Sequence, residues 1–447
     1  MHVGSCLVFE GPPPSYEELV RHIGARLHLV PRYRQRLARV PFRQGRPVWV
    51  DDPYFNLRYH LRHLALPAPG DDSNLARLCG RIFSTQLDRS KPLWEISLVD
   101  GLSGDRHALI AKTHHALIDG VSGVDLTPVL FDLEPNPEVR EPAQSSWSAR
   151  PLPSSAELLT EALLERVTVP AELSRSVRAA FRRPLKAIES ATDRLGAVGS
   201  LASAGVEPAP ESPINVPIGS HRRFTWVNSD LEDVKAIKNS LGGTVNDVVL
   251  AVVAGALGSF LRSRGFRTRG QELRAMVPVS VRAEEEHNQL GNQIAVMWAR
   301  LPIGEPNPVK RLKIITESMA EVKDSGQAVG AKALTELAGF APQTIMSQAA
   351  RLVPRQRFYN LVVTNVPGPQ VPLYLLGSQL RDIYPMVPLA ERQALGIAVM
   401  SYDGRLDFGL NGDWDALADI DLLADDLRAS LLELTEAASR APRRKPK

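Results

Sequence analysis

The sequence predicts an α/β protein built as two units joined by a helical connector. The chain has 447 residues, and roughly 150 residues per domain corresponds to about two or three domains. Apolar residues make up 44% and charged residues 23% of the chain, which is ordinary for a folded protein and disfavours wholesale disorder. Proline clusters at residues 135–153 and 208–217 indicate linkers. The predicted parts are an N-terminal unit at 1–137, linkers and connector at 138–220, a C-terminal unit at 221–439, and a basic disordered tail at 440–447.

Both units combine strands with helices. Apolar runs predict strands over residues 3–9, 94–99, 108–113, 222–227, 273–281, 292–301, 361–365, 395–402 and 405–411. Helical spacing of apolar residues predicts helices over 74–86, within 156–195 and over 421–439. Strands that alternate with helices of this length favour largely open sheets covered by helices over a β-sandwich.

The charge is nearly balanced over the whole chain but uneven along it. A net charge of +3 argues against a dedicated nucleic-acid-binding protein. Eight arginines occur between residues 21 and 46 without an acidic residue, which fits either a solvated face or a contact to an anionic cofactor. Basic and apolar residues alternate at helical spacing over 173–188. This segment fits an amphipathic helix on an anionic membrane or lipid-droplet surface, and also a core-facing helix with solvated arginines.

The cysteine content and the N-terminal residues predict a cytoplasmic location. Cys6 and Cys79 are too few for a disulfide scaffold or a Cys-only zinc site. The N-terminus has no basic region of the kind that opens a secretory signal, and the longest uncharged apolar run, at 248–261, is shorter than the ~18 residues of a membrane span. We expect a protein that is soluble, or peripheral on the inner face of the cell membrane or on lipid inclusions.

The most informative segment, 108–120, reads Ala-Leu-Ile-Ala-Lys-Thr-His-His-Ala-Leu-Ile-Asp-Gly. If the strand continues through His114 and His115, these side chains point to opposite faces of the sheet. That geometry weakens a metal-site interpretation, because two ligands must converge on one ion; no metal is expected. A histidine titrates near pH 6.5 in unperturbed surroundings, which suits a general base. Asp119 would orient the base or have a structural role.

The order His-His-x-x-x-Asp-Gly after an apolar strand resembles the acyltransferases related to chloramphenicol acetyltransferase. Further segments resemble the bacterial wax ester synthase/diacylglycerol acyltransferase family, in family order along nearly the entire chain. They are Lys-Pro-Leu-Trp at 91–94, Gly-Leu at 101–102, Val-Asn-Asp-Val-Val-Leu-Ala at 245–251, Val-Pro-Val-Ser-Val-Arg at 277–282 and Asn-Leu-Val-Val-Thr-Asn-Val-Pro-Gly-Pro at 360–369. The resemblance implies two chloramphenicol acetyltransferase-like domains, with His115 in a tunnel that coenzyme A enters from one side and the lipid acceptor from the other.

The resemblance also implies a reaction. A long-chain acyl group would move from acyl-CoA, as co-substrate, to the hydroxyl of diacylglycerol or of a long-chain alcohol, without a cofactor. His115 would act as the general base that removes the hydroxyl proton. Direct transfer needs no covalent nucleophile, and the sequence contains no Gly-x-Ser-x-Gly elbow. The sequence predicts neither the preferred acceptor nor the oligomeric state.

Asn246 is the candidate donor to the oxyanion of the tetrahedral intermediate. Thr244 followed three residues later by Asp247 resembles a capping box that starts a helix near residue 245. Asn246 would then lie in the first turn, where unpaired N–H groups and the helix dipole favour negative charge. Plain helix capping by this Asn-Asp pair is the alternative.

The remaining motif residues have supporting roles in this interpretation. In related acyltransferases the motif aspartate pairs with a distant arginine, and Arg282 matches that arginine here. An Asp119–Arg282 pair would lock the histidine loop; the alternative is a direct bond from Asp119 to His115. His114 is expected to support the site, and Gly120 to form a tight turn or to allow close approach of the substrate.

The segment Pro92-Leu93-Trp94, together with Asp247, is expected near a wall of the substrate channel, although a packed aromatic at a strand start is the common case. Family members usually have a further N-terminal stretch with a Pro-Leu-Asp motif before the segment that matches Met1. A truncated or misassigned start motivates an alternative: a catalytically weak or inactive member of the fold that binds lipid or acyl-CoA. A condensation-type acyltransferase that uses carrier-bound acyl groups is a further alternative.

Overall fold

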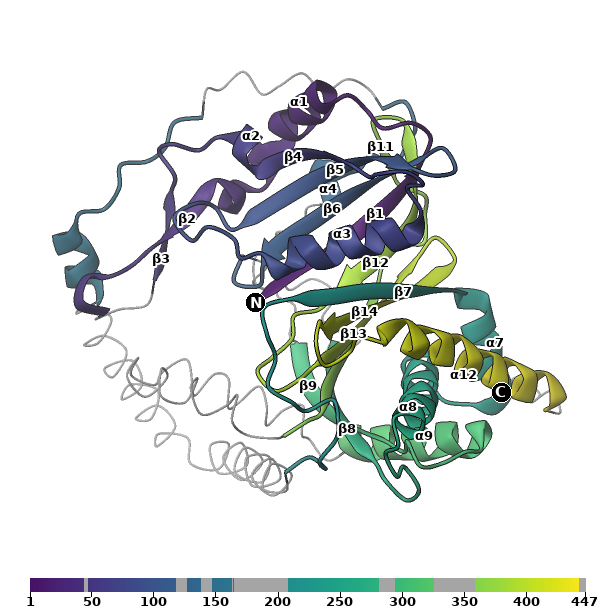
Figure 1. Ribbon diagram of the computed structural model, residues 1–447. Helices are drawn as coiled ribbons and strands as arrows, with labels where there is room; N and C mark the ends of the chain where they lie inside the picture. The colour runs from purple at the N-terminus through teal and green to yellow at the C-terminus, as the bar shows by residue number, and fades with distance from the viewer. Residues whose placement is uncertain are drawn as a thin grey trace, which may run out of the picture.

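The computed structural model describes residues 1–43, 47–117, 127–137, 147–162, 164, 208–280, 294–324 and 358–441. Within these residues the chain forms two six-stranded sheets and one two-stranded hairpin. Each large sheet is the centre of one unit, and the two units lie against each other (Figure 1). The predicted amphipathic segment at 173–188 lies outside the described residues.

The first sheet has the strand order β11-β12-β1-β6-β5-β4. Its neighbours are antiparallel, except for the parallel pair of β4 and β5. Two of its strands come from the C-terminal half of the chain, so this sheet is not built from residues 1–137 alone. The strands are β1 (His2–Glu10), β4 (Leu61–Ala65), β5 (Trp94–Leu102), β6 (Arg106–His114), β11 (Tyr374–Leu375) and β12 (Ser378–Met386).

Helices and a small hairpin complete the first unit. The helices are α1 (Tyr16–Arg26), α2 (Leu57–His60), α3 (Asp72–Ser84) and α4 (Thr127–Leu130), and three short 3-10 segments lie at Leu27–Leu29, Pro31–Arg34 and Pro41–Arg43. The hairpin pairs β2 (Gln35–Ala38) with β3 (Val48–Asp51) and projects away from the two large sheets (Figure 1).

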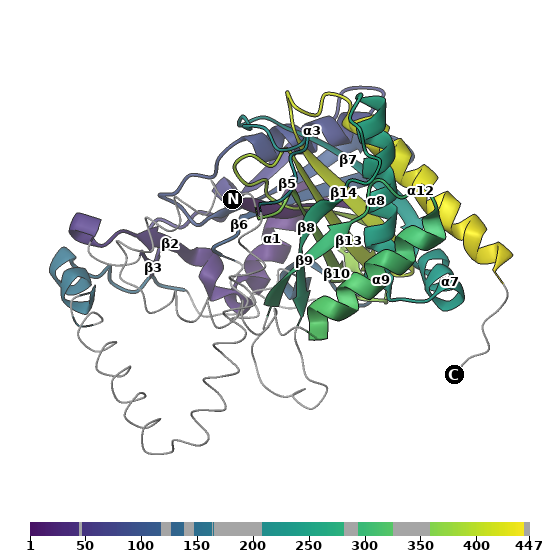
Figure 2. The same cartoon turned by 90° about the horizontal axis from the view of Figure 1, so that it is seen from below.

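The second sheet has the strand order β7-β14-β13-β10-β8-β9, with parallel pairs in its middle. Helices α8, α9 and α12 lie on one face of this sheet, as Figure 2 shows. The strands are β7 (Arg222–Asp230), β8 (Leu273–Ser280), β9 (Ile294–Leu301), β10 (Leu361–Pro367), β13 (Leu395–Tyr402) and β14 (Arg405–Asp413), and the helices are α7 (Leu231–Leu241), α8 (Val245–Ser263), α9 (Pro308–Asp324) and α12 (Ile420–Arg440).

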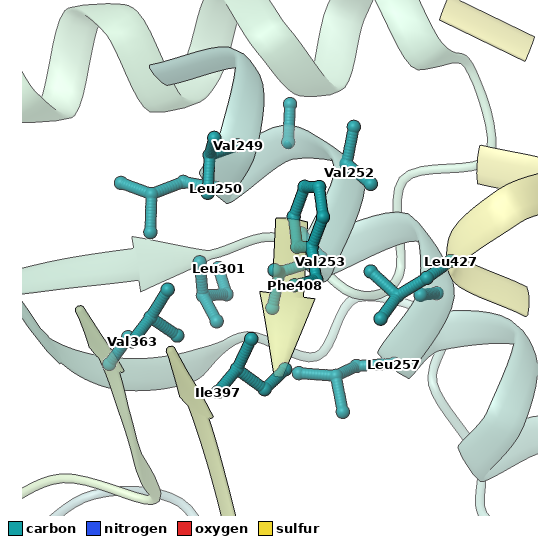
Figure 3. Close-up of a cluster of buried hydrophobic side chains, with 14 of the residues drawn as sticks. Val249, Leu250, Val252, Val253, Leu257, Leu301, Val363, Ile397, Phe408 and Leu427 are labelled. Carbon is teal, nitrogen blue, oxygen red and sulfur yellow. The ribbon is translucent and has the colours of Figure 1, made fainter. Parts of the chain in front are cut away.

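Helix α8 forms the centre of the second core. Its side chains, such as Val249, Val253 and Leu257, pack against Phe408 and Ile397 of the sheet (Figure 3). By length and composition alone α8 could cross a membrane, but 72% of its apolar window is buried inside the protein. Such burial is what the core helix of a globular unit shows, and it explains why α8 is apolar around most of its circumference.

The predicted fold class is confirmed, and each predicted strand is present among the described residues, with ends that agree with the prediction to within a few residues. Helix α3, helix α12 and the start of α8 agree with the predicted helices. Strand β12 was not predicted, because Arg381, Asp382 and Pro385 interrupt its apolar pattern. Strand β4 was missed because it has only five residues, and helices α1, α7 and α9 were also missed. The predicted unit boundaries stay a prediction.

A buried polar cluster joins the units where β12 lies against β14. The Asn228 side-chain amide donates to Asp407 Oδ1 at 3.0 Å and to the Tyr384 hydroxyl at 3.0 Å. Asp382, from β12, pairs with Arg405 at 3.0 Å. Burial, and secondarily the nearby Asp382 carboxylate, raises the pKa of Asp407 to about 7. The junction therefore favours the protonated form of Asp407.

We expect the Asp407→Asn variant to change how stability depends on pH. Because the folded-state pKa of Asp407 is raised, its protonated form stabilises the wild-type protein at low pH, and this contribution is lost as the pH rises toward 7. The unfolding free energy of the wild type, relative to the variant, should fall by roughly 2–3 kcal/mol between pH 5 and pH 8. Urea unfolding of both proteins at the two pH values measures this difference, and parallel pH profiles would contradict it.

Candidate active site

The histidine pair lies at the end of β6, which runs between β1 and β5 near the middle of the first sheet. Strand β6 ends at His114, so His115 belongs to the following turn rather than to the strand. The strand does not continue through both histidines, so strand alternation does not determine the directions of the two side chains. His114 is half-buried and His115 is exposed, so His115 is the histidine that an external molecule can reach.

Backbone hydrogen bonds fix the chain on both sides of the pair. The His114 N–H donates to the carbonyl of Leu93 at 2.9 Å, and the His115 N–H donates to the carbonyl of Met1 at 3.0 Å. The Leu117 N–H closes the turn on the His114 carbonyl at 2.8 Å. His115 is thus held by its own main chain, between the start of β1 and the segment before β5.

The His114 side chain supports this turn. Its Nδ1 accepts a hydrogen bond from the Ala116 N–H at 3.1 Å, which places the proton of the neutral ring on Nε2. Burial lowers the pKa of His114, so the neutral, accepting form of the ring is favoured. His114 thus stabilises the turn, and its supporting role in the reaction stays a prediction.

His2 is a neighbour that the sequence did not suggest. It lies directly opposite His114 across the β1–β6 pair, and the rings meet edge to face with centroids 5.9 Å apart. Its Nε2 accepts a hydrogen bond from the Leu87 N–H at 3.4 Å. Burial lowers the pKa of His2 to about 3, so the ring is neutral at physiological pH and packs against His114 without repelling it.

Lys112 is a second residue that sequence reasoning did not identify as part of the site. It lies two residues before His114 on β6 and is fully buried. Its Nζ donates to the carbonyls of Ile82 and Thr85 at 2.8 and 2.6 Å and to Glu95 Oε1 at 2.9 Å. A cation at a helix C-terminus also interacts favourably with the dipole. Lys112 therefore fastens the end of α3 to the strand that carries the histidines.

The segment Pro92-Leu93-Trp94 is buried next to the histidine turn. The Trp94 Nε1–H donates to the carbonyl of Tyr33 at 2.8 Å, and the indole stacks on His60 with ring centroids 4.5 Å apart. Trp94 is 1% exposed, so it is a core residue among the described elements. Leu93 contributes its carbonyl to the His114 N–H. A direct contact of this segment with substrate stays a prediction.

The predicted capping box at the start of α8 is confirmed. The Asp247 N–H donates to Thr244 Oγ1 at 3.2 Å, and the Thr244 N–H donates to Asp247 Oδ2 at 2.8 Å. Asn246 is half-buried in the first turn. No hydrogen bond between described residues joins Asn246 to His114 or His115, which belong to the other unit. Its role at an oxyanion stays a prediction, as does a channel position for Asp247.

Three predicted site residues, Asp119, Gly120 and Arg282, lie outside the described residues. The Asp119–Arg282 pair and the alternative Asp119–His115 bond therefore stay predictions, and so does the tunnel. Within the described ranges, no three His, Cys, Asp or Glu side chains gather as a metal ion requires. The geometry presents one exposed imidazole on a well-anchored turn, which can accept a proton from a hydroxyl brought to it.

Comparisons with known proteins cover most of the chain. The family model of the wax ester synthase/diacylglycerol acyltransferase catalytic domain matches residues 1–249, and the model of the WS/DGAT C-terminal domain matches residues 290–435. A Mycobacterium tuberculosis protein named probable diacylglycerol O-acyltransferase tgs1 is 31% identical over 447 residues, covering 98% of this chain and 92% of that protein.

Solved structures have the same architecture. The wax ester synthase/diacylglycerol acyltransferase from Marinobacter aquaeolei VT8 is 28% identical, with a TM-score of 0.67, and the match covers 98% of this chain and 95% of that chain. The starter condensation domain of rhizomide synthetase, solved with C8-CoA and Leu-SNAC, is 14% identical, with a TM-score of 0.57 and coverage of 99% and 90%. This second likeness shows the fold alone.

The Lys112→Met variant tests the anchoring of the histidine strand. Methionine keeps the apolar stem but leaves the Ile82 and Thr85 carbonyls without their donor, so we expect a loss of roughly 2–4 kcal/mol in unfolding free energy. Urea unfolding measures this loss.

The matched control is Lys310→Met. Lys310 is an exposed lysine of α9, and its Nζ lies 3.6 Å from a Glu305 carboxylate oxygen. The unfolding free energy of this control should change by no more than about 0.5 kcal/mol. Equal losses in the two variants would contradict the anchoring role.

Proposed function

This chain belongs to the wax ester synthase/diacylglycerol acyltransferase family, and on this basis we propose that it transfers a long-chain acyl group from acyl-CoA to diacylglycerol, and also to long-chain alcohols. The observation that carries the proposal is the family match over nearly the entire chain, with the His-His motif at an exposed turn of the first sheet. The name of the mycobacterial relative supports diacylglycerol as an acceptor. The condensation domain that was solved with C8-CoA supports a coenzyme A thioester as donor.

In the proposed reaction His115 is the general base. Its imidazole takes the proton of the acceptor hydroxyl while the oxygen attacks the thioester carbonyl carbon. The tetrahedral intermediate collapses with cleavage of the C–S bond, and the leaving sulfur receives the proton from the imidazolium, which gives the ester and free coenzyme A thiol. No covalent acyl-enzyme forms, and the base returns to its starting state.

The His115→Ala variant tests this assignment. Removal of a positioned general base should lower kcat by about 10²–10⁴-fold, while the variant should remain folded because His115 is held through its main-chain N–H, which alanine keeps. The assay mixes labelled long-chain acyl-CoA with diacylglycerol or a long-chain alcohol, and measures both thiol release and labelled ester by thin-layer chromatography.

His28→Ala is the matched control, because His28 is another exposed histidine of the first unit, outside the site. Its activity should equal that of the wild type. Full activity of His115→Ala would overturn the role of His115. Saturable acyl-CoA binding without ester formation by the wild type would favour the non-catalytic alternative, and transfer from carrier thioesters alone would favour the condensation-type alternative.

We also propose a peripheral location on an anionic membrane or on lipid inclusions, through the β2–β3 hairpin. Phe42, in the loop that follows β2, is 83% exposed. Its backbone has a positive φ of 55°. Arg39 is exposed beside it. An exposed aromatic side chain next to an arginine suits the interface of an anionic bilayer.

Vesicle sedimentation tests the location. The wild type should bind vesicles that contain phosphatidylglycerol more strongly than vesicles of phosphatidylcholine alone, and added salt should weaken this binding. Phe42→Ser should weaken it severalfold. Leu422→Ser is the control, at an exposed apolar residue of α12, and should bind like the wild type. Equal partition of the wild type onto both vesicle types, unaffected by salt, would contradict the proposal.

A further inference from the structure

A cleft rich in arginine lies where α3 of the first unit meets β7 and the start of α12 of the second unit. Its cavity volume is about 250 Å³. Four arginines and two aspartates are among its lining residues, so its formal charge is +2. They are Arg77, Arg222, Arg223, Arg428, Asp72 and Asp421.

Ion pairs change the charge of the cleft. Asp72 pairs with Arg106 at 3.0 Å, so its negative charge is already matched by a residue outside the cleft lining. Arg222 pairs with Asp413 at 3.6 Å and Arg428 with Asp425 at 2.8 Å, so both are matched by carboxylates outside the cleft lining. Within the described ranges these ion pairs leave two arginines, Arg77 and Arg223, and one aspartate, Asp421, a net charge of +1 (2 − 1).

Arg77 is exposed and bonds to the Asn74 side-chain oxygen, which is neutral. Arg223 donates from Nε to the Trp414 carbonyl at 3.0 Å. Among the described residues, neither Arg77 nor Arg223 has an ion pair with a carboxylate.

An aromatic surface accompanies these charges. The Arg223 guanidinium lies over the Trp414 ring at 3.7 Å from its centroid, and Trp414 is 41% exposed. Guanidinium groups bind phosphate oxygens through paired hydrogen bonds. Because the Arg223 guanidinium already covers one face of the indole, a base would stack on the opposite face or on the guanidinium plane itself. This combination fits a ligand that carries both a phosphate and a planar base.

The cleft is connected to the histidine turn through α3. The Arg222 N–H donates to Ser84 Oγ, at the end of α3, at 2.9 Å. Lys112 fastens that same end of α3 to β6, two residues before His114. Gly80, one turn before Ser84, lines the cleft, so the C-terminal half of α3 borders both the cleft and the strand that carries the histidines.

We propose that this cleft binds the phosphorylated nucleotide end of coenzyme A, with Arg77 and Arg223 on the phosphates. The inference rests on the proposed function, because it names the part of the donor that the site would hold. A volume of about 250 Å³ is below that of pockets which enclose an entire drug-sized ligand. The cleft therefore takes one end of the molecule, and the flexible thiol arm extends along α3 toward His115.

The experiment compares two acyl donors in the variants Arg77→Gln and Arg223→Ala. Arg77 is exposed on α3, so Arg77→Gln should leave the fold intact. Each variant should raise KM for acyl-CoA about tenfold, through loss of a charge-assisted contact, with kcat nearly unchanged. The acyl thioester of N-acetylcysteamine lacks the nucleotide, so its kcat/KM should stay within about twofold of wild type. An unchanged KM for acyl-CoA, or equal losses with both donors, would overturn the assignment.

Direct binding separates this inference from the proposed function. Calorimetry with 3′-phosphoadenosine 5′-diphosphate should show binding to the wild type that each variant weakens about tenfold, whether or not the protein transfers acyl groups. Arg264→Ala is the matched control, since Arg264 also lies over an aromatic ring, at 4.9 Å from the Phe260 centroid, but does not line the cleft. It should bind like the wild type. The assignment would be refuted if inorganic phosphate bound as tightly as the nucleotide. It would also be refuted if the nucleotide did not bind to the wild type.

Discussion

The hydrogen-bonded ladder of β12, β1 and β6 is the interaction on which the rest of the structure depends. Strand β1 pairs on one side with β6, which carries the histidines, and on the other side with β12, which comes from the C-terminal half. A side chain at Gly4 would collide with the Ala111 carbonyl across this ladder, so the close approach needs a glycine there. The same strand therefore positions the site and ties the two halves of the chain together.

The exposed histidine depends on a buried polar neighbourhood. Lys112 satisfies carbonyls at the end of α3, His2 accepts the Leu87 N–H, and His114 accepts the Ala116 N–H. Buried polar groups are costly unless they are hydrogen-bonded, so these contacts specify one conformation of the turn. His115 can then remain open to solvent while its backbone is fixed. The preorganisation that the proposed general base requires would come from residues that do not react.

The sequence predicted the fold class, most strands and the histidine motif, because these depend on local patterns. The capping box at Thr244 was also predictable, since its two partners are three residues apart. The role of β12 was not, because its pairing with β1 joins residues more than 370 positions apart along the chain. Lys112 was visible as a lysine within an apolar strand, but only the structure shows that the end of α3 surrounds it. The arginines of the cleft likewise come from separate elements that meet only in the folded chain.

The central claim is that His115 promotes direct transfer between two bound substrates, without an acyl-enzyme. Rapid mixing of the protein with labelled long-chain acyl-CoA in the absence of an acceptor tests it most directly, with thiol release followed by absorbance and bound label followed by mass spectrometry of the intact chain. Direct transfer predicts no burst of thiol and an unmodified protein mass until diacylglycerol is added. A thiol burst stoichiometric with protein, together with an acylated chain, would contradict the account.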